Sequence, residues 1–415
     1  MKIPFIDMCA GIGTFSYANA LTKNSAIDFI GSCEIDTFCN RVLHKHGHEL
    51  LGPLDWIGKP ESENQHSLYC KEIEHPACEL TGLTTITHEE IMEGVVEWPK
   101  GICIGFPCQN ISPASTEDLS GVAGSKSSII DDALSFAEKY DLEYMIMENS
   151  SLLPNRGLDV LLTKLDSMGF AAEWEIINAV NFGYPYYRSR CFVIAYKENT
   201  APLNLNEQVF TRVAKFANQH PGDKFPLLDD HSPQNRELAV TLETKGNFRR
   251  DRVGALGNAV VLDKAKAIIQ SLSDMIIESQ QSTLPNLNFD RPNQAFDINQ
   301  LEVNKAGYRV MPKRGFMINS QYYTDEDNNT LNPPRSTYKN LSIMPSLIRS
   351  DMKNNFTSSS RTSRPGTLGG LVGALQTKFG FDAGGLNPHY CELLQGFPKG
   401  FTEVVKNELS FKLPS

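Results

Sequence analysis

The sequence predicts an α/β protein with a mostly parallel sheet and a smaller, irregular second lobe. In the first 200 residues, short apolar runs alternate with stretches suited to helices, which is the pattern of a parallel sheet covered by helices. From about residue 280 to residue 365, the composition shifts toward Asn, Ser, Pro, Thr, Arg and Lys, and helical periodicity is absent. A length of 415 residues leaves room for more than one domain.

The predicted elements alternate along the chain. Strands are expected over residues 3–7, 29–34, 101–106, 144–147 and 191–196, each of which is a short apolar run. Helices are expected over residues 15–21, 37–46, 127–140, 158–168 and 258–278, and the last has apolar residues near the i, i+3, i+4, i+7 spacing. Residues 49–98 are polar and have the character of an insertion, and residues 198–250 are expected to be mostly loop.

Composition excludes several classes of protein. With 40% hydrophobic and 21% charged residues, the chain is not disordered, collagen-like or a disulfide-rich mini-protein. It has no run of about 18 apolar residues, so no membrane span is expected, and its first residues, MKIPFID, make a poor signal peptide. Nine cysteines without a pairing pattern favour free thiols in the cytoplasm. His44, His46 and His48 are spaced so that only the outer two share a helix face, so we expect no metal site.

The charge of the chain is unevenly distributed. The whole chain has a net charge of -10, but residues 281–380 hold 12 basic and 7 acidic side chains. A basic module on an acidic body is compatible with DNA binding through that module. An excess of this size is equally typical of ordinary fluctuation in composition, so charge alone does not decide the point.

A glycine turn follows the first predicted strand, in the sequence DMCAGIGTF over residues 7–15. A strand, a Gly-x-Gly turn and a helix form the arrangement in which a nucleotide-like ligand meets a helix N-terminus. The second strand ends at Glu34, about 20 residues further on, where an acid can bind ribose hydroxyls. Each feature alone is also typical of a plain tight turn or a surface acid. Together they indicate a site for a nucleoside-containing cofactor.

Three further segments bring reactive side chains to the ends of predicted strands. GFPCQ places Cys108 just after a strand, where open α/β sheets bind ligands and a thiolate can attack an electrophile. ENS places Glu148 at the end of the next strand, where a carboxyl group can exchange a proton. RSR places Arg188 and Arg190 on one face of an extended segment. Taken singly, a buried structural cysteine, a surface glutamate and solvated arginines are the ordinary interpretations.

These segments together, in this order, resemble the cytosine-C5 DNA methyltransferase family. The resemblance covers about residues 1–200, 250–275 and 386–404 and rests on six short segments: AGIG (10–13), GFPCQ (105–109), ENS (148–150), RSR (188–190), GNAVV (257–261) and LQGFP (394–398). It implies a Rossmann-like class I methyltransferase domain over residues 1–280, a target-recognition domain over 281–385, and a C-terminal segment, 386–415, that returns to the catalytic domain.

The resemblance also implies a chemical plan. Cys108 would attack carbon 6 of cytosine, and Glu148 would contact ring N3 and offset the charge that develops there. Arg190, with its neighbour Arg188, would contact the base, and Asn149 would hold the active-site loop. The target base must leave the DNA stack to reach Cys108, so base flipping is implied.

The cofactor implied by the resemblance is S-adenosyl-L-methionine. It would lie over the glycine turn, with Glu34 on its ribose and the GNAVV segment at its amino-acid end. The residues expected to bind it are Asp7, Ala10, Gly11, Ile12, Gly13, Glu34, Ile35, Phe106, Asn258 and Ala259.

Double-stranded DNA is the expected substrate, and its contacts are expected from two regions. The Ser- and Gly-rich stretch 112–128 resembles the family's mobile loop that closes over DNA, and basic side chains of 281–385 are suited to phosphates and base edges. The expected DNA-binding residues are Gln109, Ser112, Arg309, Lys313, Arg314, Arg335, Arg349 and Arg361, with Lys339, Lys353 and Arg364 as further candidates.

The chain departs from the family pattern at several positions. Cys9 stands where the family has an aromatic residue, Thr14 where it has glycine, and Tyr186 where it has glutamine. No clear acid for the adenine amino group is found. The GNAVV segment precedes the recognition-like region and LQGFP comes near the end, which resembles the rearranged order of some phage and prophage-type members.

Two other readings stay open at the level of sequence. The same fold can act on RNA, although the basic lobe of about 100 residues favours a DNA duplex. The second alternative is a DNA-binding protein that has lost catalytic activity. The joint presence of Cys108, Glu148 and Arg190 argues against it. We expect a monomer with a cognate restriction endonuclease as a further partner.

Overall fold

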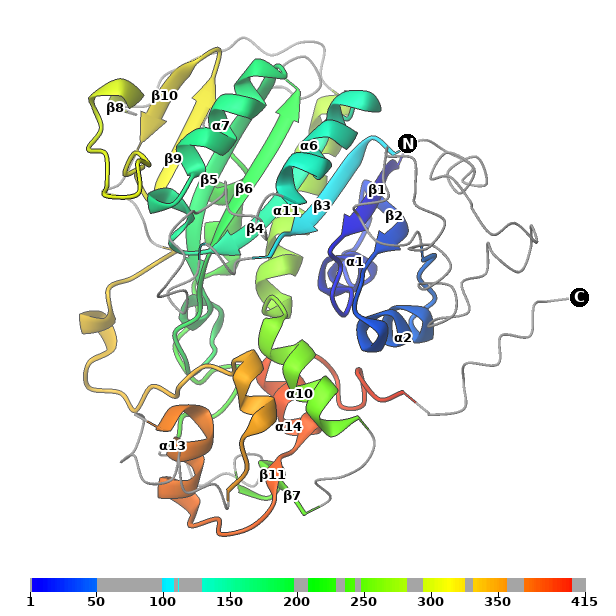
Figure 1. The fold of residues 1–415 in the computed structure, drawn as a ribbon, viewed down its shortest axis with the longest axis vertical. Coiled ribbons are helices and arrows are strands. Elements are labelled where there is room, and N and C mark those ends of the chain that lie inside the picture. The colour runs from blue at the N-terminus through cyan, green and yellow to red at the C-terminus, as the bar shows by residue number, and fades with distance from the viewer. Residues whose placement is uncertain are drawn as a thin grey trace, which may run out of the picture.

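A nine-stranded sheet with helices on both faces lies above a smaller lobe in the computed structural model of the chain (Figure 1). The structure describes residues 2–50, 99–107, 111, 129–197, 208–228, 236–242, 248–281, 294–324, 331–356 and 369–404. Cys108, Gln109, Ser112 and Arg361, together with residues 51–98 of the predicted insertion and the whole loop 112–128, lie outside these residues.

The sheet has the strand order β2-β1-β3-β4-β6-β5-β9-β10-β8. Its strands are β1 (Ile3–Met8), β2 (Ile27–Cys33), β3 (Gly101–Gly105), β4 (Tyr144–Ser150), β5 (Phe170–Asn178), β6 (Ser189–Lys197), β8 (Gln294–Phe296), β9 (Arg314–Ile318) and β10 (Gln321–Thr324). All five predicted strands are confirmed to within a few residues.

The prediction of a mostly parallel sheet is wrong. Among the described strands, only β2, β1, β3 and β4 pair in parallel, and the other five pairings of this sheet are antiparallel. The cause is that β6 runs between β4 and β5 against both, and β9, β10 and β8 then extend the sheet as an antiparallel meander. Strand β5 was missed by sequence, because all nine of its residues are buried and two of them are glutamates.

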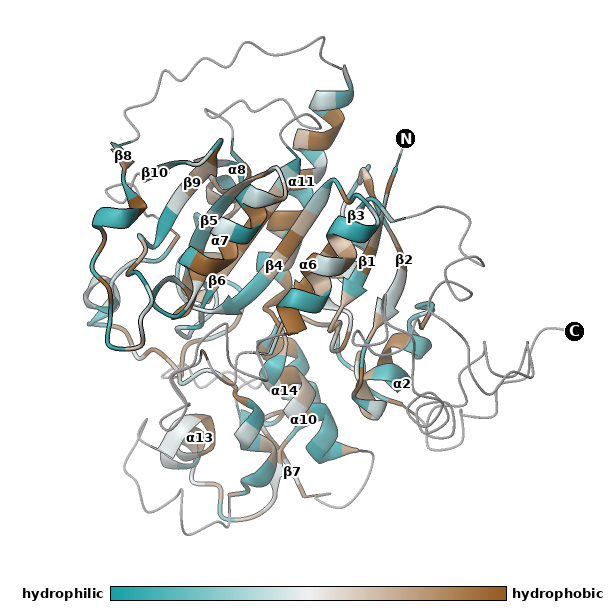
Figure 2. Cartoon of the chain, turned by 45° about the horizontal axis from the view of Figure 1, so that its top comes forward, coloured by the Kyte–Doolittle hydropathy of each residue, from teal (hydrophilic) through white to brown (hydrophobic). Residues whose placement is uncertain are grey.

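The helices divide between the two faces of the sheet. Helices α6 (Ile129–Lys139) and α7 (Leu158–Ser167) pack on one face, and α1 (Thr14–Ala20), α8 (Val209–Phe216) and α11 (Leu262–Gln281) pack on the other. Both apolar and polar residues line these helices in Figure 2, as expected for amphipathic helices on a sheet. Helix α2 (Thr37–Lys45) starts where the Asp36 side chain accepts hydrogen bonds from Phe38 N and Cys39 N.

The single helix predicted over 258–278 is two helices. Helix α10 (Arg249–Asn258) ends at Asn258, Ala259 is extended, and α11 starts at Leu262. The GNAVV segment is therefore a junction between two helices, which places its backbone carbonyl groups where side chains of the sheet can reach them.

The smaller lobe is built from segments far apart in the sequence. It holds α10, α13 (Gly370–Phe379), α14 (Pro388–Leu394), the 3-10 turn η9 (Arg349–Lys353) and a two-stranded sheet of β7 (Val240–Thr241) and β11 (Gly385–Leu386) (Figure 1). The segment expected to form one recognition domain, 281–385, thus contributes β8, β9 and β10 to the main sheet and the later turns and α13 to the smaller lobe.

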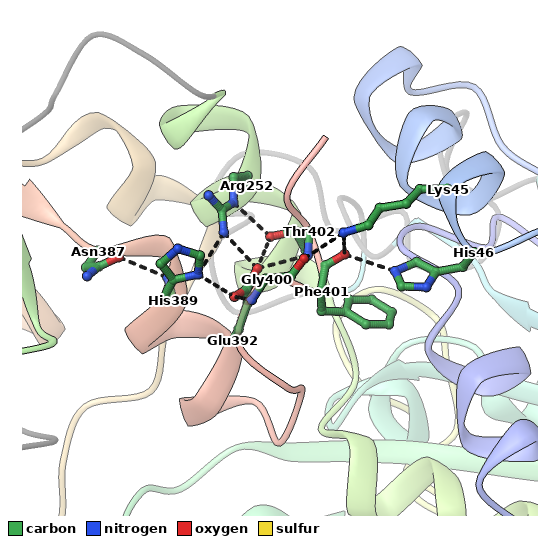
Figure 3. Close-up of polar contacts among 9 residues, drawn as sticks. All are labelled: Lys45, His46, Arg252, Asn387, His389, Glu392, Gly400, Phe401 and Thr402. Atoms are coloured by element: carbon green, nitrogen blue, oxygen red, sulfur yellow. Dashed lines mark hydrogen bonds and ion pairs between the residues drawn. The ribbon is translucent and has the colours of Figure 1, made fainter. Parts of the chain in front are cut away.

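A buried polar cluster joins the smaller lobe to the N-terminal part of the chain (Figure 3). The carboxylate of Glu392 is fully buried and accepts hydrogen bonds from Arg252, His389 and the Gly400 and Thr402 backbones at 2.6–3.0 Å. Burial raises the pKa of Glu392, but the hydrogen bonds outweigh burial and the pKa is lowered overall. Next to it, Lys45 Nζ and His46 Nε2 reach the carbonyl oxygens of Gly400 and Phe401 at 2.7 and 2.9 Å.

Candidate active site at the carboxyl edge of the sheet

The glycine turn after β1 keeps its outer face open. Gly11 and Gly13 have φ of +57° and +75°, and Cys9 has φ of +51°, which a residue with a side chain rarely adopts. A Cβ atom placed on Gly11 would meet nothing within 4 Å, whereas one on Gly13 would lie 2.9 Å from His48 and from Leu43. The turn therefore presents bare backbone outward at Gly11 and packs against α2 at Gly13.

Glu34 closes this turn. Its Oε2 accepts a 2.6 Å hydrogen bond from Gly11 N, and its Oε1 accepts from Ile35 N and Asp36 N at 2.8 Å. Burial raises the pKa of Glu34, and the backbone hydrogen bonds oppose that rise. The neighbouring Ile35 side chain is 74% exposed, so an apolar surface stands uncovered beside the turn.

These features fit S-adenosyl-L-methionine. The molecule needs an approach to backbone without side chains, an acid for its ribose hydroxyls and an apolar face for its adenine. Gly11 offers the bare backbone, and Glu34 and Ile35, which follow β2 and lie beside the turn, offer the acid and the apolar face. Ala10 is half-buried beside the turn, but the Ile12 side chain is only 2% exposed, so only the backbone of Ile12 can face the cofactor.

A buried polar chain that the sequence did not reveal lies beneath the turn. Asp7 accepts a 3.2 Å hydrogen bond from Ser16 Oγ, which lies 3.4 Å from His48 Nε2, and His48 Nδ1 lies 2.8 Å from Ser32 Oγ. Burial raises the pKa of Asp7 to about 8 and lowers the pKa of His48 to about 4. His46 and His48 thus have hydrogen-bond partners of their own, and the described residues contain no group of three or more metal-binding side chains.

Glu148 and Arg190 form an ion pair at the end of β4. Arg190 Nε lies 3.0 Å from Glu148 Oε1, and the two side chains are 26% and 12% exposed. The register of β4 and β6 explains the contact, because Ser150 pairs with Arg190 and Glu148 is two residues away on the same face. Gly105 pairs with Glu148 from the other side, and a Cβ atom on it would lie 3.5 Å from Glu148 Oε2.

Asn149 holds the segment that leads to Cys108. Its side chain is buried, its Nδ2 donates a 3.0 Å hydrogen bond to Phe106 O, and its Oδ1 accepts from Ser150 N at 2.7 Å. Phe106 itself is 2% exposed, so its side chain lies in the core and its backbone faces Asn149. Since Phe106 is two residues before Cys108, this contact fixes where the chain leaves β3 toward the cysteine.

Arg188 occupies a different environment from Arg190. Its guanidinium group is buried and donates hydrogen bonds to Leu347 O, Gly257 O and Ala259 O at 2.8–2.9 Å. It therefore joins the sheet to the α10–α11 junction and to the smaller lobe. Asn258 lies at this junction with its side chain exposed.

Lys264 is a second residue that sequence reasoning missed. It is fully buried, its Nζ donates to Arg188 O at 3.0 Å, and it lies 5.7 Å from the centre of the Phe192 ring. Burial lowers its pKa well below the usual lysine value, and Arg190 and Arg188 lower it further. Its position was a usable signal, since Lys264 lies three residues after Val261 and four before Ile268, on the apolar face of α11.

The predicted DNA-binding arginines and lysines fall into two groups. Arg314 is 11% exposed and lies 3.5 Å from Glu175, and Arg309 is bound to Asn299 and to Asp159, so both serve contacts within the fold. Lys313, Arg335 and Arg349 have exposed side chains, as do Lys339 and Lys353.

Comparison with known proteins indicates the family. The family model of the C-5 cytosine-specific DNA methylases matches residues 66–413. The type II methyltransferase M.Sau3AI of Staphylococcus aureus is 23% identical over 99% of this chain and 91% of its own length. M.BsuFI of Bacillus subtilis is 28% identical over 60% of this chain and 51% of its own length.

Among solved structures, the S. pombe Dnmt2 methyltransferase aligns with a TM-score of 0.34 and 15% identity, covering 52% of this chain and 55% of that one. In the described part of the chain, no helix is long and apolar enough to cross a membrane. Because the family model covers most of the sequence, the chain belongs to the C-5 cytosine-specific DNA methylase family.

Proposed function

We propose that this DNA cytosine-5 methyltransferase acts on a flipped-out cytosine in duplex DNA through a covalent bond between Cys108 and carbon 6 of the base. The family activity, with S-adenosyl-L-methionine as methyl donor, follows from membership of the family. The observation that carries the residue assignment is the Glu148–Arg190 ion pair, beside which Asn149 anchors the backbone two residues before Cys108.

The cofactor-binding group in this proposal consists of Gly11, Glu34 and Ile35, with the backbones of Ala10, Ile12 and Gly13. Asn258 and Ala259 border the amino-acid end, and Asp7 and Phe106 support the two strand ends from below. When bound, S-adenosyl-L-methionine supplies a methyl group on a positively charged sulfur.

The chemistry assigned to the chain's own residues starts with the Cys108 thiolate. Its electron pair forms a bond to carbon 6, and the electrons of the C5–C6 double bond move into the ring, which makes carbon 5 nucleophilic. A proton taken up from solvent and shared between a Glu148 oxygen and ring N3 offsets the negative charge that develops there, and Arg190 holds Glu148 and faces the base. After carbon 5 has gained the methyl group, a water molecule takes the proton of carbon 5, the electron pair of that C–H bond forms the C5–C6 double bond again, and Cys108 leaves carbon 6 as a thiolate with the electrons of the carbon–sulfur bond.

Asn149 and Arg188 act as positioning residues. Asn149 holds the Phe106 carbonyl, and Arg188 holds the carbonyls of Gly257 and Ala259. We assign DNA contact to Lys313, Arg335 and Arg349, together with Gln109, Ser112 and Arg361 from outside the described residues, and leave out Arg309 and Arg314 because of their internal partners.

The order of the segments is proposed to be the rearranged, prophage-type one. Its support is that Leu262 N donates a 3.0 Å hydrogen bond to Gln395 O, so the GNAVV and LQGFP segments meet in space despite their order in the chain. A monomeric cytoplasmic enzyme and a cognate endonuclease complete the proposal.

The test is base-resolution sequencing of unmethylated plasmid DNA after incubation with the protein and S-adenosyl-L-methionine. A methylated cytosine at a recurring sequence is expected, and Cys108→Ala should give none while it still binds DNA. Full transfer by Cys108→Ala would contradict the covalent mechanism. Transfer to RNA but not to duplex DNA would contradict the assigned substrate.

A further inference from the structure

A buried lysine lies beside the strand ends that carry the proposed catalytic pair. Lys264, in the first turn of α11, is 0% exposed, and its Nζ donates to Arg188 O at 3.0 Å and to Ile177 O at 3.5 Å. Arg188 comes two residues before Arg190, and Ile177 is the residue of β5 that pairs with Arg190. The amino group therefore contacts both the chain that leads into Arg190 and the strand next to it.

Lys264 also lies on the face of the sheet from which Glu148 and Arg190 project. Phe192 follows Arg190 by two residues, so their side chains share one face of β6, and Phe192 pairs with Glu148 of β4. Lys264 Nζ lies 5.7 Å from the centre of the Phe192 ring. The amino group and the Glu148–Arg190 ion pair thus border the same aromatic side chain.

The lysine completes a reciprocal contact between β6 and α11. The Arg188 guanidinium group donates to Gly257 O and Ala259 O, just before α11 begins, and Lys264 donates back to Arg188 O. Ala179 N also donates to Arg188 O, at 3.3 Å, so Lys264 makes the shorter of the two contacts. Hydrogen bonds in both directions therefore hold the start of the strand against the start of the helix.

Stability does not account for a lysine at this position. Among the described residues, no carboxylate forms an ion pair with Lys264, and both of its acceptors are backbone carbonyl oxygens. Taking an amino group out of water is costly, and a methionine would fill the same space on the apolar face of α11 without that cost. The benefit of the lysine therefore lies in the two carbonyl groups that it holds.

We propose that Lys264 is a positioning residue for methyl transfer, which holds the backbone around Arg190 so that the Arg190 guanidinium group meets Glu148 and the base. The inference rests on the proposed function, because that function places the reacting cytosine at Glu148 and Arg190. Lys264 acts through Arg190 and touches neither the base nor the cofactor.

The first measurement compares Lys264→Met with Lys266→Met. Lys266 is a half-buried lysine of the same helix, so this control carries the same substitution two residues away. Under single-turnover conditions with unmethylated plasmid DNA, Lys264→Met should lower the rate of methyl transfer roughly 10- to 100-fold, as for a displacement of about 1 Å in a positioned group. Its dissociation constants for S-adenosyl-L-methionine and for the plasmid should change less than about twofold, and Lys266→Met should match the wild type throughout.

The second measurement is a double-mutant cycle with Arg190→Lys, which keeps a cation but loses the Nε contact with Glu148. If Lys264 acts through Arg190, Lys264→Met should slow the Arg190→Lys enzyme by less than about threefold, because the group that it positions is already gone. A purely structural role for Lys264 would give the full loss in both backgrounds. Lys264→Leu, which also suits the apolar face of α11, replaces Lys264→Met in the cycle if the methionine variant does not fold.

Two results would overturn the inference: a wild-type rate in the folded Lys264 variant, or equal losses in the wild-type and Arg190→Lys backgrounds. The proposed function has its own readouts in the same assay. Arg190→Lys should itself be slow, and a wild-type rate in that variant would contradict the role assigned to Arg190. Absence of transfer by the wild type would contradict the proposed function as a whole.

Discussion

Asn149 Nδ2 donates a 3.0 Å hydrogen bond to Phe106 O, and this bond ties the end of β4 to the chain that leaves β3. Both groups are buried, so no water can replace the amide if it is removed. In the proposed mechanism, the bond therefore sets the position of the backbone two residues before Cys108.

Asn149→Ala should lower kcat by roughly 10- to 100-fold, because a displacement of about 1 Å in a reacting group has effects of this size. It should also lower the free energy of unfolding by about 1–3 kcal/mol, the usual cost of leaving a buried carbonyl without a donor. Single-turnover methyl transfer and urea unfolding measure the two effects. Wild-type turnover in this variant would show that the bond does not position the cysteine.

Glu34→Ala should weaken S-adenosyl-L-methionine binding by roughly tenfold or more, since charge-assisted hydrogen bonds contribute about 1.5–3 kcal/mol. The carboxylate also holds Gly11 N, so the turn loses its closure. Calorimetric titration with the cofactor gives the affinity, and anisotropy with duplex DNA is the comparison. Equal losses toward both ligands would indicate a general structural defect.

Asp7→Asn should remove the part of the pH dependence of the free energy of unfolding that comes from titration of Asp7. The pKa of Asp7 rises from 3.8 to about 8 on burial, so between these values the folded state holds a proton that the unfolded state has released. Stability from this group is therefore present at low pH and is lost as pH rises toward 8, by about 1.4 kcal/mol per pH unit.

Unfolding free energies from pH 5 to pH 8 measure this slope for wild type and Asp7→Asn. Glu173, whose pKa burial raises to about 7, contributes to both proteins and cancels in the difference. Asp28→Asn, at an exposed carboxylate on β2, is the matched charge control. Parallel curves for wild type and Asp7→Asn would show that Asp7 is ionised in the folded protein.

Lys264→Met should reduce methyl transfer with little change in cofactor affinity, because it removes the donor to Arg188 O. The free energy of unfolding of Lys264→Met should also rise relative to that of the wild type as pH falls. The lowered pKa of Lys264 means that the unfolded state takes up a proton that the folded state does not, which destabilises only the wild type. Urea unfolding at pH 6 and pH 9 tests the sign, and a stability difference independent of pH would contradict it.

Local patterns predicted the strands and helices that carry the site. Strand β1 and the glycine turn follow from an apolar run and a Gly-x-Gly sequence, both of which act within a few residues. Glu148 and Arg190 could be named because each lies at the end of an apolar run. Their partnership depends on β6 lying next to β4, which short-range patterns do not specify.

Long-range contacts account for what the sequence left out. Strand β5 is buried on both faces and contains Glu173 and Glu175, whose charges meet the start of α8 and Arg314. Nothing near them in the sequence indicates those partners. Arg188 has the same character, because its three acceptors come from residues 257, 259 and 347.

The contact of Lys45 with Gly400 spans 355 positions of the chain. At roughly 5–20 residues per second, a ribosome takes about 18–70 s to cover that interval. During this time α2 and the glycine turn have been synthesised, but the residues that pack over Lys45 and His46 have not. The nascent N-terminal region must therefore remain soluble while part of its surface lacks its cover, and maturation of the enzyme waits on residues 392–402.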